Sequence, residues 1–249
     1  MNAVDREELR RWGDALEGAP AERILADAAA RFPGRIGFAT GFGAEGCVLV
    51  DLAARAGLAI DVFTLDTGAL FPETYDLWRR LEARYGITIR GVRAADPGAP
   101  DLWKSDPDRC CELRKVRPLR AELARLDAWV TAIRRDQTPD RANARVVEWD
   151  AKFGLVKVNP LAAWTSRDVW DHARALGVPT NPLHEQGYTS IGCAPCTRAI
   201  RPGENSRAGR WWWETGAPKE CGIHCTIETG SFEHEAEAIL SEARAYGQR

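Results

Sequence analysis

The sequence predicts an α/β fold in which a mainly parallel, twisted sheet is flanked by helices. Short apolar segments typical of buried strands alternate with longer segments typical of helices. Strands that alternate with helices are joined by crossovers, which makes most of them parallel. At 249 residues and 45% hydrophobic, the chain is also long enough for one sizeable core.

The expected elements begin with a charged, Ala-rich helical stretch over residues 3–31. A buried strand (35–40) and an apolar helix (47–56) follow, and then a second strand (59–65) and an amphipathic helix (71–85). Further strands are expected at 87–92, 128–133, 145–148 and 155–158. We predict a nucleotide-binding domain over residues 1–205, and a C-terminal catalytic segment over 206–249 that folds back over the site.

Composition excludes several classes of protein. The formal net charge of −2 argues against binding nucleic acid through a global positive field. No apolar run approaches the roughly 20 residues that span a bilayer, and the N-terminus is charged, so we expect a cytoplasmic protein with no membrane partner. In that reducing compartment, seven cysteines are expected to be metal ligands or redox-active thiols.

A glycine-rich turn follows the first strand, at Thr40, Gly41, Phe42 and Gly43. Such a turn at a helix N-terminus exposes backbone N–H groups that bind anions. It lacks the GK[ST] ending of a Walker A loop, and a simple tight connection is the alternative. The turn after the second strand, at Asp66 and Thr67, is expected at the same sheet edge, where ligands bind in such folds.

Two close cysteine pairs, Cys110 with Cys111 and Cys193 with Cys196, provide four soft ligands. Adjacent cysteines chelate a single ion poorly, whereas in a cubane each thiolate binds its own iron. The pattern therefore favours a [4Fe-4S] cluster over zinc. Four small buried hydrophobic side chains are the non-functional alternative.

Basic residues near these motifs could meet an anionic ligand, because guanidinium and ammonium groups bind phosphate and sulfate oxygens. Lys115 follows Cys111 by four residues, which places both on one face if the helix continues through residues 112–119. A solvated lysine and surface ion pairs are the alternatives. The four candidate arginines are Arg134, Arg135, Arg207 and Arg210.

Near the C-terminus, Cys221 precedes His224 by three residues. A cysteine beside histidine and arginine groups can become a reactive thiolate, so Cys221 is the candidate nucleophile. Cys225 leaves a disulfide or metal ligation open. By contrast, we expect His172, His184 and His234, like the tryptophans at 211–213, to be packing or surface residues.

Seven stretches taken together resemble one enzyme family: TGFGAE, TLDTGALFPET, CCELRK, RRDQT, GCAPC, RAGRWWWE and KECGIH. They occur in the right order between Arg35 and Cys225 and are similar to the assimilatory adenylyl-sulfate reductases, within the phosphoadenylyl-sulfate reductase family. The resemblance implies an adenine-nucleotide α-hydrolase-like fold with a modified pyrophosphate loop.

The resemblance also implies a function: reduction of adenylyl sulfate to sulfite and AMP, in sulfate assimilation and cysteine biosynthesis. Cys221 would attack the sulfur to form a Cys-S-sulfonate, with His224 beside it, and reduced thioredoxin or a similar dithiol would release sulfite. Lys115, Arg207 and Arg210 match positions that contact the phosphosulfate. The four paired cysteines match the family's [4Fe-4S] ligands, and homo-oligomers are expected by analogy alone.

The chain departs from the family pattern at three places. The loop lacks the two serines common in relatives, Pro107 stands where some relatives carry a histidine, and Cys225 is not expected. A reductase acting on phosphoadenylyl sulfate or on both nucleotides is an alternative, because only a few residues near the ribose decide between the two substrates. An ATP-dependent tRNA thiolation enzyme and a non-enzymatic iron–sulfur sensor are more distant alternatives.

Overall fold

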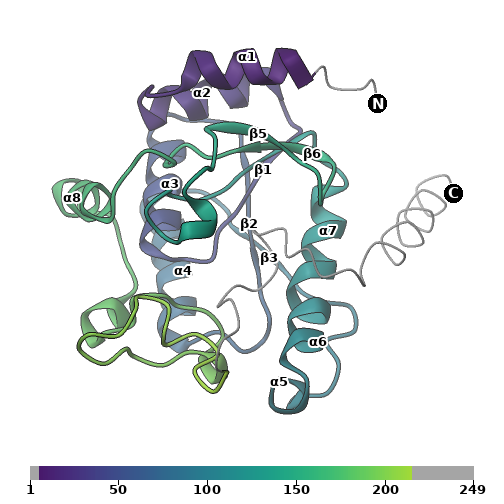
Figure 1. Ribbon diagram of the computed structural model, residues 1–249, viewed down its shortest axis with the longest axis vertical. Helices are drawn as coiled ribbons and strands as arrows, with labels where there is room; N and C mark the ends of the chain where they lie inside the picture. Colours follow the sequence, from purple (N-terminus) through teal and green to yellow (C-terminus); the bar gives the residue numbers. More distant parts are fainter. Residues whose placement is uncertain (1–5, 215–249) are drawn as a thin grey trace, which may run out of the picture.

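Six strands form one sheet in the order β3-β2-β1-β4-β6-β5 in the computed structural model, which describes residues 6–214 (Figure 1). All neighbouring strands are parallel except β5, which pairs antiparallel with β6 at one edge. The predicted mainly parallel α/β sheet is confirmed. The strands are β1 Ile36–Ala39, β2 Asp61–Leu65, β3 Arg90–Val92, β4 Ala128–Val130, β5 Val147–Asp150 and β6 Leu155–Val158.

Helices cover both faces of this sheet (Figure 1). The α-helices are α1 Arg6–Leu16, α2 Ala21–Arg31, α3 Ala44–Arg55, α4 Pro72–Tyr85, α5 Leu102–Ser105, α6 Pro107–Cys111, α7 Arg117–Leu123 and α8 Ser166–Leu176. One π-helical turn, η1 Glu112–Val116, joins α6 to α7. The 3₁₀-helices are η2 Pro139–Arg141, η3 Pro182–Gln186 and η4 Ala194–Cys196.

The strands are apolar on both faces, as expected for a sheet buried between helices. Successive side chains point to opposite faces, so Val62 and Val130 join the core beneath α3, α4 and α8. Their neighbours Phe63 and Trp129 join a smaller core beneath α7. The run of strand residues that pattern analysis detects therefore serves two separate hydrophobic cores.

The N-terminal helical stretch differs from the prediction of one segment over residues 3–31. It forms two helices, because Gly18 takes a left-handed backbone with φ of 76° and Pro20 occupies the N-cap of α2. The helix expected over 47–56 begins three residues earlier, at Ala44. Part of the glycine-rich turn therefore belongs to the first turn of α3.

The C-terminal part of the described chain is bonded to the rest of the protein. Trp211 donates its backbone N–H to the Cys196 carbonyl at 3.1 Å, and Arg198 donates to the Gly209 carbonyl at 3.0 Å. Residues 206–214 thus pack on the loop that carries Cys196. The predicted boundary at 205/206 stays a prediction, and the greater part of the predicted catalytic segment, with Cys221, His224, Cys225 and His234, lies outside the described residues.

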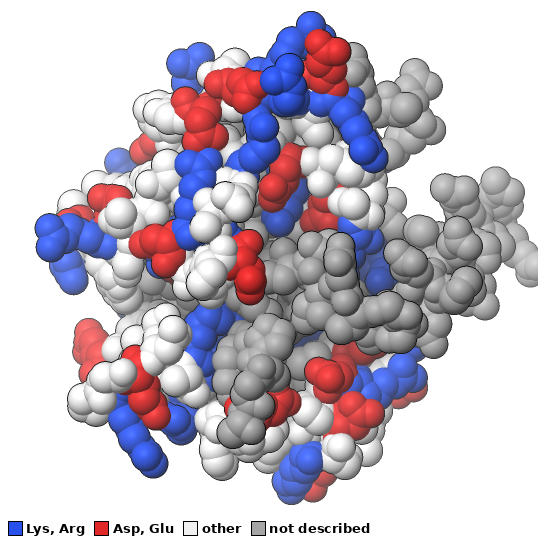
Figure 2. All heavy atoms as spheres, in the orientation of Figure 1, with Lys and Arg blue, Asp and Glu red and all other residues white. Residues whose placement is uncertain are grey.

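Surface charge agrees with the near-neutral composition. On the face shown in Figure 2, acidic and basic side chains are interspersed. Within residues 6–214, no helix has both the length and the apolar character needed to cross a membrane.

Thr165 caps α8 in a way that can be tested. Its side chain accepts a hydrogen bond from the Asp168 N–H at 3.2 Å, and Asp168 accepts one from the Thr165 N–H at 2.7 Å. We expect Thr165→Ala to lower the free energy of unfolding by about 1 kcal/mol, because the Asp168 N–H in the first turn of α8 loses its acceptor. Urea denaturation measures this, with exposed Arg167→Ala as the control; equal midpoints for the two variants would contradict it.

Candidate active site

A cavity of about 660 Å³ opens at the carboxyl ends of β1, β2 and β4. This volume suits a nucleotide-sized ligand, and the position is where ligands bind in open parallel sheets. Its walls come from the glycine-rich turn, the end of β2, the segment after β4, and residues between 184 and 210. The structure therefore brings together the turns that the sequence placed at one edge.

The glycine-rich turn forms one wall. Phe42 has a φ of 58°, a left-handed conformation uncommon outside glycine, and donates its backbone N–H to Thr40 Oγ1 at 3.1 Å. Its buried ring stacks on Trp78, with centroids 5.7 Å apart. Gly46 is needed behind the turn, since a Cβ there would lie 2.7 Å from Thr40 Oγ1. These contacts constrain the conformation of the turn, and Thr40, Gly41, Phe42 and Gly43 all line the cavity.

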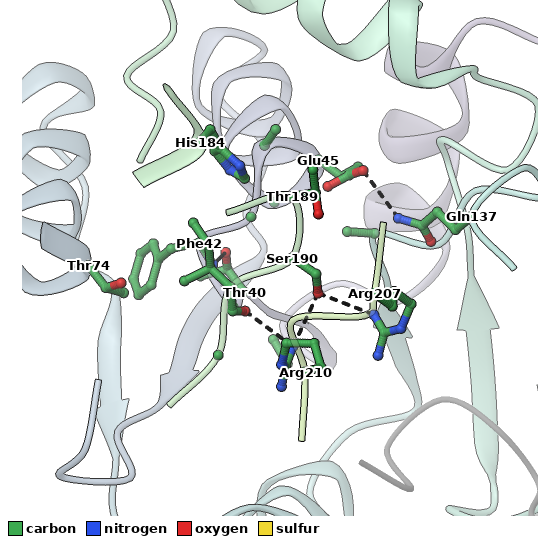
Figure 3. Close-up of a pocket in the computed structure, with 18 of the residues that line it drawn as sticks. Thr40, Phe42, Glu45, Thr74, Gln137, His184, Thr189, Ser190, Arg207 and Arg210 are labelled. Atoms are coloured by element: carbon green, nitrogen blue, oxygen red, sulfur yellow. Dashed lines mark hydrogen bonds between the residues drawn. The ribbon is translucent and has the colours of Figure 1, made fainter. Parts of the chain in front are cut away.

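Arg210 is buried in the opposite wall, with its residue only 6% exposed. Its guanidinium lies 4.5 Å from the centroid of the Trp211 ring and donates to Ser190 Oγ at 3.3 Å. It also fills the space beside Gly192, where a Cβ would lie 2.6 Å from Arg210 Cζ. Arg207 reaches the same Ser190 hydroxyl at 3.4 Å, so two guanidiniums share one corner (Figure 3).

Lys115 reaches the cavity from η1, the π-helical turn. A helix that continued regularly from Cys111 would place Lys115 on the same face, whereas the structure inserts a π turn, a feature frequent at functional sites. Lys115 is 9% exposed, and its ammonium lies 6.0 Å from the Trp211 ring centroid. The cations of Lys115 and Arg210 therefore both lie against one indole ring.

Two residues predicted to contact the ligand, Arg135 and Asp66, lie outside the cavity lining. Arg135 donates to the Ala144 carbonyl and to Glu17, and it does not line the cavity. Asp66 is also outside the lining; it accepts hydrogen bonds from Tyr75, Arg93 and the Gly68 N–H. Although burial alone raises it, these donors hold the pKa of Asp66 below its usual value.

Arg134 and Thr67 do line the cavity. The charge of Arg134 is already compensated, because Glu45 accepts from its Nε at 3.0 Å and Asp136 pairs with its Nη1. Thr67 contacts the sulfur of Cys193 at 3.2 Å through its hydroxyl. Arg134 thus stiffens the loop, while Thr67 links the cavity to the cysteines.

None of the four predicted ligand cysteines, Cys110, Cys111, Cys193 and Cys196, forms a disulfide in the described residues, and Cys193 lines the cavity. Cys111 packs with buried Cys193 and Cys196 in one cluster that also holds Trp211. Cys110 lies close enough for its charge to raise the pKa of Cys196. Segments 81 residues apart in the sequence therefore meet, as the pattern predicted.

The charges around these thiols differ. Burial and the neighbouring Cys193 raise the pKa of Cys196 to about 11. Burial also tends to raise that of Cys193, but Lys115, the Thr67 hydroxyl and Arg210 together hold the pKa of Cys193 below its usual value. The same cations that face the cavity therefore also face the cysteines.

Across residues 6–214, no group of three or more His, Cys, Asp or Glu side chains is arranged to hold a metal ion. A single ion needs its sulfurs about 2.3 Å from one point. In a cubane cluster each thiolate binds a different iron, so the sulfurs stand farther apart. Thiolates are the donors that iron–sulfur clusters use, and the gathering of Cys111, Cys193 and Cys196 supplies such a donor set.

Several cavity residues were not predicted from the sequence. Ser190 connects the two arginines, and Arg141 donates to Gln137 at 2.6 Å. His184 lines the cavity while its ring packs against Trp170, as expected of a packing residue. His172 packs against Trp164 and bonds buried Asp51, also as expected, and it lies outside the cavity lining.

Comparisons with known proteins agree with this site. Residues 35–199 match the phosphoadenosine phosphosulfate reductase domain. An adenosine 5′-phosphosulfate reductase of Allochromatium vinosum is 49% identical over 75% of this chain and 77% of its own length. One of Rhodococcus erythropolis is 41% identical over 91% of both chains. A solved phosphoadenylyl-sulfate reductase of Candida auris, in complex with phosphate, superposes with a TM-score of 0.70 and 27% identity, covering 80% of this chain and 98% of that one.

Gly192→Ala tests whether the position of Arg210 matters. The added Cβ would overlap the guanidinium and displace it without changing its charge. A charge-assisted hydrogen bond contributes about 1.5–3 kcal/mol, so we expect AMP, used as a probe, to bind roughly ten-fold or more weakly in calorimetry. In the double variant with Arg210→Ala, Gly192→Ala should add little further loss. Additive losses would show that the glycine acts independently of Arg210.

Proposed function

The chain belongs to the phosphoadenosine phosphosulfate reductase family, and we propose that it reduces adenylyl sulfate to sulfite and AMP in sulfate assimilation. The observation that carries the proposal is the position of three cationic side chains. Lys115, Arg207 and Arg210 line a nucleotide-sized cavity together with the glycine-rich turn. Relatives that cover most of this chain are named for that activity.

The reaction is a sulfonate transfer followed by a reduction. The thiolate of Cys221 attacks the sulfur, a sulfur–sulfur bond forms, and the bond from sulfur to the bridging phosphate oxygen breaks. AMP leaves with that electron pair. Reduced thioredoxin or a similar dithiol then attacks Cys221, sulfite departs, and the second thiol regenerates Cys221 as the dithiol becomes a disulfide.

The cations act on charge. The attacking thiolate, the transferred sulfonate and the leaving phosphate are all anionic, so the barrier is largely electrostatic. Arg207 and Arg210 are held beside Ser190 before any ligand binds, and the Trp211 ring supports Arg210. Such prearranged donors stabilise the developing charge on AMP without reorganising during the reaction. His224 is proposed to assist Cys221.

A [4Fe-4S] cluster is proposed on Cys110, Cys111, Cys193 and Cys196. When bound, it would join the two cysteine segments and contribute to the electrostatics near Lys115. We propose no electron-transfer role for it, because the dithiol supplies the electrons. A cytoplasmic location and a homo-oligomeric state belong to the same proposal, as expectations from the sequence.

Reduction of phosphoadenylyl sulfate is the second candidate. The matching domain family carries that substrate in its name, and the Candida auris structure is a phosphoadenylyl-sulfate reductase. The sequence relatives named for adenylyl sulfate are more similar to this chain, which favours the unphosphorylated nucleotide.

Turnover by anaerobically purified protein with reduced thioredoxin tests the reaction. We expect sulfite from adenylyl sulfate in preference to phosphoadenylyl sulfate, because the named relatives act on the former. Without thioredoxin, mass spectrometry should find one sulfonate added to the wild type and to Cys225→Ser, but none on Cys221→Ser. Preference for the phosphorylated nucleotide would move the assignment to the second candidate, and sulfite from neither nucleotide would refute the reductase.

Iron analysis tests the cluster independently of activity. We expect Cys196→Ala to lose bound iron and acid-labile sulfide, because one of four ligands is removed. Cys47→Ala is the matched control, since Cys47 is buried in α3 and burial raises its pKa to about 12. Tightly bound zinc without iron in the wild type would favour the zinc alternative instead.

A further inference from the structure

His184 occupies a position in the cavity that the reaction above does not use. It lies in η3, whose first turn is fixed by Asn181: this side chain accepts from the Leu183 N–H and donates to Thr74 Oγ1. The imidazole packs edge-on against Trp170, with ring centroids 5.2 Å apart and planes at 87°. Its orientation is therefore set by three separate elements: η3, α4 and α8.

The hydrogen bonds of the ring assign its tautomer. His184 Nδ1 lies 2.8 Å from the backbone carbonyl oxygen of Tyr188. A carbonyl oxygen can only accept, so Nδ1 carries the proton and donates it. In the neutral ring, Nε2 then presents a lone pair. Burial lowers the pKa of His184, although Glu45 opposes that effect, so the ring is neutral at neutral pH.

The lone pair has no partner in the described part of the chain. Nε2 is buried, and residues 6–214 supply no hydrogen-bond donor to it. A buried acceptor without a donor is costly and rare in folded proteins. Because His184 lines the cavity, a ligand bound there can supply the missing donor.

The chemistry of the ligand limits which of its groups can do so. The phosphosulfate of adenylyl sulfate offers acceptor oxygens only, whereas the nucleoside has donors in its 6-amino group and its ribose hydroxyls. Figure 3 shows His184 apart from Arg207 and Arg210, the groups suited to the anionic end. The nucleoside end of the ligand is therefore the part that matches Nε2.

We infer that His184 is a specificity-determining residue, whose Nε2 accepts a hydrogen bond from the nucleoside of the bound nucleotide. This inference rests on the proposed function for the identity of the ligand. It gives the cavity two chemically opposite ends, with donors for the phosphosulfate and an acceptor for the nucleoside. A ligand without the matching donor leaves a buried lone pair unpaired, and the site rejects it.

Calorimetric titration with AMP and three analogues tests the inference on the full-length protein. The analogues are 2′-deoxy-AMP, 3′-deoxy-AMP and purine riboside 5′-monophosphate, each of which lacks one donor. We expect the wild type to bind one of them about ten-fold or more weakly than AMP. The affected analogue identifies the donor as a ribose hydroxyl or the 6-amino group.

His184→Phe provides the matched comparison, because it keeps an aromatic ring against Trp170 and removes the acceptor. We expect it to bind AMP as weakly as the wild type binds the affected analogue, and to bind both ligands equally. His184→Gln, which retains an acceptor oxygen, should recover part of the discrimination. Thermal unfolding shows whether each variant is folded, and the wild-type analogue series stands even where a variant is not.

The outcomes separate this inference from the proposed function. Suppose that sulfite is released from adenylyl sulfate, but His184→Phe changes the affinity for every analogue by the same factor as the affinity for AMP. The reductase function then stands and the inference on His184 fails. If AMP binding depends on His184 but no sulfite forms, the nucleoside contact stands and the reaction fails. If neither AMP nor adenylyl sulfate binds the wild type, the proposed function and the inference on His184 are both overturned.

Discussion

The buried guanidinium of Arg210 is the interaction on which the arrangement of the site depends. Moving a cation out of water is expensive, and its partners here are Ser190 Oγ, a backbone carbonyl and the face of Trp211. The backbone N–H of Trp211 in turn donates a hydrogen bond to the Cys196 carbonyl, and Gly192 leaves the space that the guanidinium fills. One charge thus fixes the spacing between the cavity and the cysteines. An anionic ligand would relieve that electrostatic cost, which ties stability of this region to occupancy.

The sheet could be predicted because its signal is local. A strand that is buried on both faces appears in the sequence as a short apolar run. The crossover connections between strands then predict parallel pairing, which four strand pairs of the sheet show. The cysteine pairs and the glycine-rich turn could also be predicted, because each is a short motif whose residue types and spacing suit few functions. The break between α1 and α2 has a local cause as well, in Gly18 and Pro20, although the composition around it is helical.

Other features of the site depend on contacts between distant segments, which spacing does not report. Arg134 and Arg135 are adjacent, yet one faces the cavity and the other reaches Glu17 in the turn after α1. Asp66 ends a strand at the right edge, but Tyr75 and Arg93 turn it into a structural carboxylate. His184 gave no signal at all. A lone histidine becomes meaningful only when Trp170 and the Tyr188 carbonyl fix which nitrogen faces the ligand.

The π turn at Glu112–Val116 changes which way the residues on either side of it face, and the two sides have different roles. On its C-terminal side, Leu119 and Leu123 pack on the sheet. On its N-terminal side, Cys111 packs with the other cysteines, and Cys110 lies close enough to Cys196 to raise its pKa. Each residue of an α-helix advances the face by about 100°. A deletion of one residue here would keep α7 on the sheet and rotate the cysteine pair away from its partners. The one extra residue of the π turn therefore decides whether the four cysteines lie together, while the fold of the sheet is the same in either case.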